Sequence, residues 1–149
     1  MIRTEIITDL GQINPQHWEM LLARCPDSTI FQSRGWITSW WIAFARSDMQ
    51  VHSIAAYDDK DLVGLALLYM TSRRVFGLRL AELRFIGEGP SDYNLFSVRD
   101  GAPEIVDRLV EEVSRELNNG IAIMLADVPQ FSSLAFCLSA RQPRRLGPR

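Results

Sequence analysis

The chain has 149 residues, of which 47% are hydrophobic and 23% charged, the proportions of one packed globular domain. Its formal net charge of -2 gives no bulk attraction to polyanions, which disfavours generic binding to nucleic acids or membrane surfaces. We therefore expect small molecules or other proteins as partners.

The N-terminal third predicts one strand and two helices. Residues 1–5 lack the basic and apolar regions of a secretory signal, which favours a cytoplasmic protein. Residues 2–8 are β-branched and apolar enough for a strand. Asn14 and Pro15 then begin a helix that Pro26 ends. Ser33 can cap a second helix with a broad aromatic face, which we expect to cover a sheet.

The middle of the chain predicts three strands. Residues 51–57 and 62–71 form a hairpin around the turn 58–61, and the second strand is apolar on both faces and therefore central. The apolar run 62–70 is far shorter than the roughly 20 residues that span a bilayer, so no membrane span is expected. A third strand, 78–86, follows a basic turn at 72–74. Its charged residues alternate imperfectly with apolar ones, which predicts one face toward solvent or a partner.

The C-terminal third predicts a long helix, a strand and a short helix. Pro103 begins the helix and residues 118–120 end it. A buried strand over 121–126 and an apolar helix over 131–138 follow. The buried stripe of the long helix is expected to contain Ile105, Val106, Leu109, Val110, Val113 and Leu117.

The element order is therefore β-α-α-β-β-β-α-β-α, which predicts an α/β fold with a mixed sheet flanked by helices. Residues 1–140 form one domain. Residues 141–149 are rich in arginine, proline and glycine, and this composition predicts a mobile basic tail.

Cysteines and histidines give no sign of a metal site. Cys25 and Cys137 lie on apolar helical faces outside any C-x-x-C pair, so we expect buried free thiols. His17 and His52 are isolated from each other and from other ligand types. No metal is therefore predicted.

Two segments carry a family resemblance. One is Phe31-Gln32-Ser33 leading into Gly35-Trp36 and Trp40-Trp41, and the other is the strand-to-loop segment 85–94, Phe-Ile-Gly-Glu-Gly-Pro-Ser-Asp-Tyr-Asn. Together they resemble the N-terminal domain of CelD-type, FemAB-like proteins of the GNAT acyltransferase superfamily. The resemblance covers residues 18–129. It implies a GNAT-like fold without its last two strands, because nothing after Ala140 corresponds to them.

The resemblance also implies a site and a reaction. Gln32, Trp36 and Asn94 would bind substrate, and Asp92 and Tyr93 would be catalytic. Asp92 would orient or deprotonate an amine, and Tyr93 would donate a proton to the leaving thiolate. A second interpretation is that Asp92 and Asn94 stabilise a turn through side-chain bonds to nearby backbone N–H groups.

The implied co-substrate is acetyl-CoA or another acyl-CoA. A typical GNAT enzyme binds its pyrophosphate with a glycine-rich loop before the third helix, whereas the loop 87–101 is long and acidic. Two functions therefore stay open. One is acyl transfer to a small-molecule amine or cell-envelope precursor, a role tied to cellulose biosynthesis by the family name alone. The other is a non-catalytic substrate-recognition or interaction half, which needs a second GNAT-like domain. A strand at 121–127 left at the edge of the sheet would also favour a homodimer.

Overall fold

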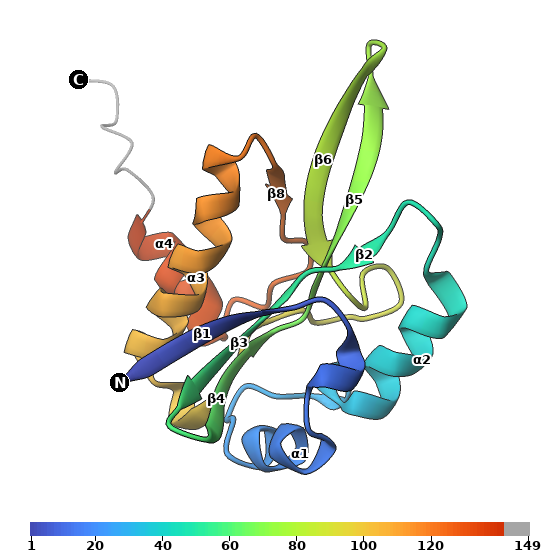
Figure 1. Ribbon diagram of the computed structural model, residues 1–149. Helices are drawn as coiled ribbons and strands as arrows, with labels where there is room; N and C mark the ends of the chain where they lie inside the picture. The colour runs from blue at the N-terminus through green and yellow to red at the C-terminus, as the bar shows by residue number, and fades with distance from the viewer. Residues whose placement is uncertain (142–149) are drawn as a thin grey trace, which may run out of the picture.

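The computed structural model describes residues 1–141 and confirms the predicted order of helices and strands, except that two predicted strands are each divided and a short strand, β7, is added (Figure 1). Two four-stranded sheets are present, in the orders β1-β3-β4-β7 and β2-β5-β6-β8. All strand pairs are antiparallel except β6 with β8. The elements are β1 (Ile2–Ile7), α1 (Pro15–Ala23), α2 (Arg34–Phe44), β2 (Gln50–Val51), β3 (Ser53–Asp58), β4 (Asp61–Ala66), β5 (Leu68–Val75), β6 (Leu78–Phe85), β7 (Ser97–Val98), α3 (Pro103–Asn118), β8 (Ala122–Met124) and α4 (Ser133–Arg141).

The two strands predicted over 51–57 and 62–71 are each divided in two, and a buried serine lies where they divide. The Ser53 hydroxyl donates to the Leu68 carbonyl at 3.0 Å and accepts from the Leu68 N–H at 2.9 Å. The Ser53 side chain thus takes the place of a backbone hydrogen-bond partner between β3 and β5. The chain then passes from one sheet to the other at His52 and Leu67. The apolar pattern could not indicate this division, because both halves are buried.

The turn between β5 and β6 lies at Phe76-Gly77, so the basic turn predicted at 72–74 is wrong. Those residues continue β5, and Val75 pairs with Leu78 across a two-residue loop. Both loop residues have positive φ, 50° for Phe76 and 78° for Gly77. This is the geometry of a type I′ hairpin turn, which matches the twist of the flanking strands.

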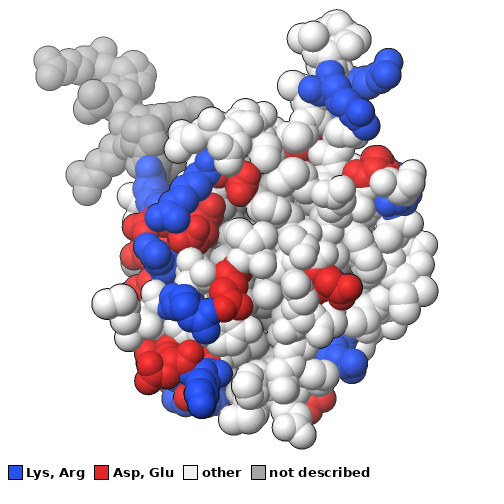
Figure 2. All heavy atoms as spheres, viewed as in Figure 1, with Lys and Arg blue, Asp and Glu red and all other residues white. Residues whose placement is uncertain are grey.

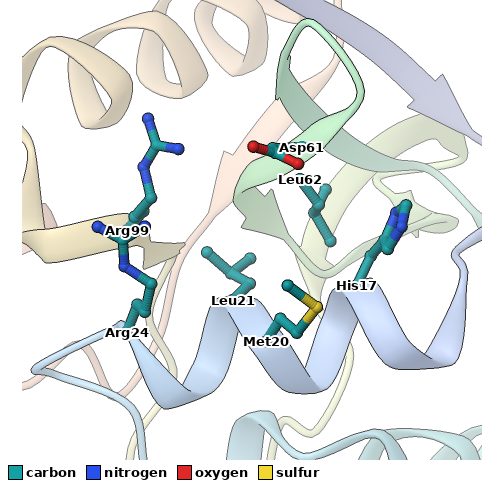
Figure 3. Close-up of a pocket in the computed structure, with 7 residues that line it drawn as sticks. All are labelled: His17, Met20, Leu21, Arg24, Asp61, Leu62 and Arg99. Atoms are coloured by element: carbon teal, nitrogen blue, oxygen red, sulfur yellow. The ribbon is translucent and has the colours of Figure 1, made fainter.

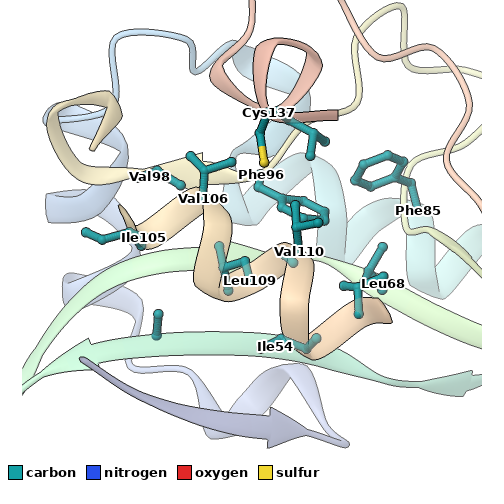
Figure 4. Packing of buried hydrophobic residues seen from close by; sticks show 14 of the residues in the cluster. Ile54, Leu68, Phe85, Phe96, Val98, Ile105, Val106, Leu109, Val110 and Cys137 are labelled. Carbon is teal, nitrogen blue, oxygen red and sulfur yellow. The ribbon is translucent and has the colours of Figure 1, made fainter. Parts of the chain in front are cut away.

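One face of the strands packs against α3 and α4 (Figure 4). Gly64 on β4 permits this approach, because a Cβ there would lie 2.7 Å from Ile105 Cγ2. The predicted stripe of α3 is buried from Ile105 to Val113, whereas Leu117, in the last turn, is exposed. Burying these five apolar side chains contributes on the order of 10 kcal/mol. The labelled members of this core are Ile54, Leu68, Phe85, Phe96, Val98, Ile105, Val106, Leu109, Val110 and Cys137.

The opposite side of the strands is covered by α1 and α2, as the aromatic stripe predicted. Trp18 is completely buried and donates its indole N–H to the Gln32 carbonyl at 3.0 Å. The helices begin where their caps predicted: the Asn14 side chain accepts from two backbone N–H groups of α1, and that of Ser33 accepts from one of α2. Both cysteines, Cys25 and Cys137, are buried free thiols.

The second half of the predicted loop 87–101 belongs to the core. Leu95 and Phe96 are buried, and the short strand β7 pairs with β4 through Gly64↔Val98 and Leu65↔Ser97. Residues 87–96 are free of strand and helix, and only their first part, 87–94, contains exposed side chains. The acidic and glycine-rich start of the segment concealed the apolar run that follows it.

Strand β8 is less buried than the sequence predicted. It pairs with β6 alone among the described residues, and Ala122 and Met124 are exposed. A strand at the edge of a sheet lacks the neighbour that would cover its outer side.

The last helix extends further than predicted. It runs to Arg141, whose guanidinium lies 3.0 Å from the Asp107 carboxylate. Arg141 was predicted as the first residue of the mobile tail. The remainder of that tail, 142–149, lies outside the described residues.

Candidate functional site

The loop 87–94 begins where β6 ends, and a glycine sets its shape. Gly87 has φ of 109°, and a Cβ there would lie 2.8 Å from Ser91 Oγ and 3.3 Å from Asn94 Oδ1. The Ser91 N–H also donates to the Gly87 carbonyl at 3.1 Å. The loop is therefore folded tightly back on its first residue, and only glycine fits there.

Side chains from the start of α2 and the turn before it hold this loop. Trp36 donates its indole N–H to Ser91 Oγ at 2.8 Å, and Trp40 donates its own to the Glu88 carbonyl at 3.1 Å. The buried Gln32 donates to the Tyr93 carbonyl at 2.9 Å, and its Oε1 accepts from Thr29. The polar atoms of Gln32 and Trp36 are thus engaged within the protein. Their contacts position the loop.

Asn94 joins the loop to the chain that leaves β8. Its backbone N–H donates to the Asp127 carbonyl at 3.0 Å, and its side-chain amide donates to the Ala126 carbonyl at 3.4 Å. Because β6 and β8 are parallel, the segments that follow them meet at the same edge of the sheet. The Asn94 amide thus reaches a distant segment rather than making the local turn bonds of the second interpretation.

Asp92 and Tyr93 are exposed between these anchors. The Tyr93 ring lies edge-on to Phe31 at 6.3 Å and to Phe131 at 5.6 Å, and Phe31 lies edge-on to Trp36 at 5.2 Å. These four rings form a row at the surface, which we call the aromatic row. Within residues 1–141, no hydrogen bond or ion pair engages the Asp92 carboxylate. Asp92 is thus exposed one residue before Tyr93, a member of the aromatic row.

A buried ionic cluster lies on β6, at the base of the loop. Glu82 is only 3% exposed and accepts from the Nε atoms of Arg84 at 2.9 Å and Arg73 at 3.1 Å. Arg84 also pairs with Glu88, whose second carboxylate oxygen is buried without a partner. Burial alone would lower the pKa of Arg84. The hydrogen bond that Arg84 donates to Glu82 and the negative charge of Glu88 outweigh this effect, so the pKa of Arg84 is raised. This cluster fixes the strand end from which the loop departs.

The sequence missed this cluster because Glu82 and Arg84 were assigned to a solvent face of β6. Their i, i+2 spacing does place both side chains on one face of the strand. The opposite charges at that spacing were therefore the signal that an internal ion pair was possible.

The beginning of α3 does not fit the pyrophosphate of an acyl-CoA. Its N-cap is Ala102, which offers no side-chain bond, and Glu104 lies in the first turn. Asp100 precedes it and already engages Arg24, while Arg99 lies 3.5 Å from Asp58. Nearby positive charges are thus neutralised, and the acidic groups would repel a phosphate. The structure agrees here with the acidic composition of the loop.

The beginning of α4 is occupied in a similar way. Asp27, from the segment after α1, accepts from the N–H of Ser133 at 2.7 Å and from its hydroxyl at 2.9 Å. A carboxylate of the protein therefore takes the place that an anionic ligand would need at this helix N-terminus.

A small hollow lies between α1 and β4 (Figure 3). Its volume of about 100 Å³ is below the roughly 300 Å³ of a typical small-molecule pocket. Two of its arginines, Arg24 and Arg99, already pair with carboxylates. Figure 3 shows its seven lining residues, His17, Met20, Leu21, Arg24, Asp61, Leu62 and Arg99.

Neither a metal site nor a membrane helix is found in the described part of the chain. No group of three His, Cys, Asp or Glu side chains there could hold a metal ion. No helix within residues 1–141 has the length and apolar character needed to cross a bilayer.

Comparisons with known proteins show a likeness of fold. No family model matches the chain, and no curated protein sequence does. Among solved structures, an aminoglycoside acetyltransferase from an uncultured soil metagenomic sample matches with a TM-score of 0.56 and 15% identity, over 100% of this chain and 95% of that one. A ribosomal-protein-alanine N-acetyltransferase from Brucella melitensis biovar Abortus 2308 matches with a TM-score of 0.48 and 12% identity, over 96% and 93%.

The first of these likenesses identifies the architecture. The chain has the mixed α/β fold of the GNAT acetyltransferases, with helices on both faces of its strands. At 15% identity the likeness concerns the fold alone. The CelD-type and FemAB-like subtype stays a prediction.

Proposed function

We propose that this chain acts in acyl transfer to an amine, and that its own residues supply the binding site of the acceptor. The observation that supports this proposal is the exposed Asp92 carboxylate, one residue before Tyr93 of the aromatic row, on a fold shared with acetyltransferases. A carboxylate attracts an ammonium group, and aromatic faces add a cation–π attraction of roughly 0.5–1 kcal/mol at an exposed site. An amine fits this combination better than an anionic or neutral acceptor.

Asp92 has a defined role in this proposal. A protonated amine is not a nucleophile, so it must lose a proton before it can attack an acyl carbon. The Asp92 carboxylate would hold the ammonium group in place and receive that proton. Tyr93 would contribute its ring to the acceptor surface. The proton donation to the leaving group that the resemblance implies for Tyr93 stays a prediction.

Gln32, Trp36 and Asn94 would act as positioning residues. Each holds a different point of the loop, at Tyr93, Ser91 and the segment after β8, respectively. Truncating any of them should misplace Asp92 relative to the aromatic row without removing a group that touches the acceptor.

The acceptor would be a small molecule with a free amino group, including an aminoglycoside or an amine-bearing cell-envelope precursor. The first class is the one named for the acetyltransferase with the 0.56 TM-score. Acetyl-CoA or another acyl-CoA is the donor that the fold implies.

A second candidate function is supported by the acidic start of α3. If no phosphate binds there, the chain would recognise the acceptor while a second GNAT-like domain, in the same or another chain, binds the donor. The unpaired side of β8 is a place where such a domain or a second copy could add a strand.

Calorimetric titration with acetyl-CoA and free CoA separates the two functions. Saturable micromolar binding, about -8 kcal/mol, would support autonomous acyl transfer. Absence of heat would support the recognition half. Either result leaves the acceptor site to be tested separately.

Acceptor binding is tested by titrating an aminoglycoside and a polyamine into the protein and into Asp92→Asn. The variant should bind at least tenfold more weakly, because it loses the carboxylate charge but keeps the shape. Asp59→Asn is the matched control, since Asp59 is an exposed acid in the β3–β4 turn at φ of 54°, a conformation that asparagine also tolerates. Equal amine binding by the protein and by Asp92→Asn would refute the proposed acceptor site.

A further inference from the structure

The β5–β6 hairpin projects from the body of the protein (Figure 1). At its base, β2 pairs with Met70 and Tyr69 of β5, and β8 pairs with residues 82–84 of β6. Between Ser72 and Ala81 the two strands pair only with each other among the described elements. The outer half of the hairpin, residues 72–81, is therefore unsupported by the fold. We call it the hairpin arm.

The end of the hairpin arm is apolar. Phe76 is fully exposed, Leu78 is 69% exposed and Leu80 is 40% exposed. An isolated exposed apolar residue is ordinary on a protein surface, but several close together at the end of a projection are a mark of an interaction site.

Behind the tip, the hairpin arm is strongly basic. It contains Arg73, Arg74 and Arg79 and no Asp or Glu, within a chain whose net charge is -2. Figure 2 shows the uncharged tip with positively charged side chains directly below it. Arg73 pairs with Glu82, whereas Arg74 and Arg79 have no ion pair in the described residues.

Two features of the hairpin arm work against folding. Phe76 occupies a left-handed position of the type I′ turn, where asparagine or glycine is strongly preferred and a bulky side chain is strained. Arg74 and Arg79 lie directly opposite each other in the strand register, and like charges at such positions are destabilising. Local folding energetics therefore do not account for these residues, and backbone strain of this kind often accompanies function.

We infer that the hairpin arm binds the surface of an anionic membrane. Phe76 and Leu78 enter the boundary between headgroups and acyl chains, and Arg74 and Arg79 contact lipid phosphates. The order of the groups favours lipid over other polyanions, because the apolar residues lie outermost and the arginines follow one step behind. Interfacial anchors combine these two contributions in this way. An arm that binds nucleic acid would carry its charges outermost, and a nucleic acid offers no apolar layer for Leu78.

The inference concerns a surface contact, and it goes beyond acyl transfer. The net charge of -2 does not exclude membrane binding by the hairpin arm. Electrostatic attraction to a membrane falls off within a Debye length, about 10 Å. The charges that matter are those of the projecting hairpin arm.

Vesicle co-sedimentation tests the inference. The protein should bind vesicles of phosphatidylcholine mixed with phosphatidylglycerol, bind phosphatidylcholine alone much less, and be released by salt. Replacing Arg74 and Arg79 together by glutamine should weaken binding roughly thirtyfold, from about one kcal/mol per arginine. Arg34→Gln is the matched control, because Arg34 is also exposed but lies on α2. This control should leave binding unchanged.

Phe76→Asn separates membrane binding from folding. Asparagine suits the left-handed position better, so the melting temperature should stay the same or rise. Vesicle binding should nevertheless fall by roughly tenfold, because the apolar side chain at the tip is lost. Ile42→Ser is the control, since Ile42 is 85% exposed on α2, away from the hairpin arm.

Three results would overturn the inference. The first is equal binding to neutral and anionic vesicles, or none to either. The second is vesicle binding that none of the hairpin-arm variants changes. The third is binding of a single-stranded oligonucleotide, or formation of a dimer, that depends on the hairpin arm in the absence of vesicle binding. That result would assign the surface to nucleic acid or to a second copy.

Discussion

The bonds of the Ser53 hydroxyl provide a direct test of how this fold joins its two sheets. Ser53 is fully buried and bonds both the N–H and the carbonyl of Leu68. In Ser53→Ala the Leu68 carbonyl keeps the His52 N–H at 2.9 Å. The Leu68 N–H, however, loses its partner inside the core. A buried donor without a partner costs about 1–3 kcal/mol, which lowers the melting temperature of a domain of this size by roughly 5 °C.

A second buried serine supplies the comparison. Ser97 on β7 is also fully buried, but its hydroxyl has no hydrogen-bond partner. Ser97→Ala removes a polar group that gains nothing from its surroundings, so stability should stay the same or rise by up to about 1 kcal/mol.

Urea unfolding followed by tryptophan fluorescence measures both variants. Their free energies of unfolding should differ by about 2 kcal/mol, in favour of Ser97→Ala. If both variants lose the same stability, loss of side-chain volume rather than of hydrogen bonds controls these sites. The account of how the two sheets are joined would then be wrong.

Three further predictions concern the loop, a surface carboxylate and the sheet edge. In urea unfolding, Gly87→Ala should lower the free energy of unfolding by about 2 kcal/mol more than Gly89→Ala does. Both glycines have positive φ, but only a Cβ at Gly87 would collide with a neighbour, at 2.8 Å from Ser91 Oγ. Equal losses of stability in the two variants would refute the collision. Bonds from Cys137 and Arg141 lower the pKa of Asp107, so its stabilisation is present above its ordinary pKa near 4 and is lost as the pH falls through the lower folded value. The stability difference between the protein and Asp107→Asn should therefore disappear in acid, and a constant difference would contradict the sign. Sedimentation should reveal a dimer if the unpaired side of β8 is used, and a strictly monomeric species would count against it.

The acceptor proposal and the membrane inference rest on different parts of the molecule. The first depends on the loop 87–94 and the aromatic row, whereas the second depends on the hairpin arm. Phe76→Asn should therefore leave amine binding unchanged, and Asp92→Asn should leave vesicle binding unchanged. A result that refutes the acceptor proposal therefore leaves the membrane inference unaffected, and the reverse also holds.

The sequence predicted which residues gather at the candidate site but not the contacts that they make. The motif placed Gln32, Trp36 and Asp92 in one group, and the structure does bring them to one loop. Their contacts could not be predicted, because Gln32 and Tyr93 are 61 residues apart and meet only when α2 packs beside the end of β6. The buried position of Glu82 was missed for a different reason, since a charged residue on an alternating strand usually faces solvent.

The sequence by itself determined the order of the helices and main strands, the beginnings of the first two helices and the apolar faces of α2 and α3. These follow from side-chain periodicity and from capping residues such as Asn14 and Ser33, which act within a few neighbours along the chain. Tertiary structure alone decided where the strands divide at Ser53, that β8 stays exposed, and that the β5–β6 hairpin leaves the body of the protein. Each of these depends on which distant segments pair. The hydrophobic pattern indicates that a residue prefers burial. Packing of the whole chain decides which partner buries that residue, or whether it stays exposed as Phe76 does.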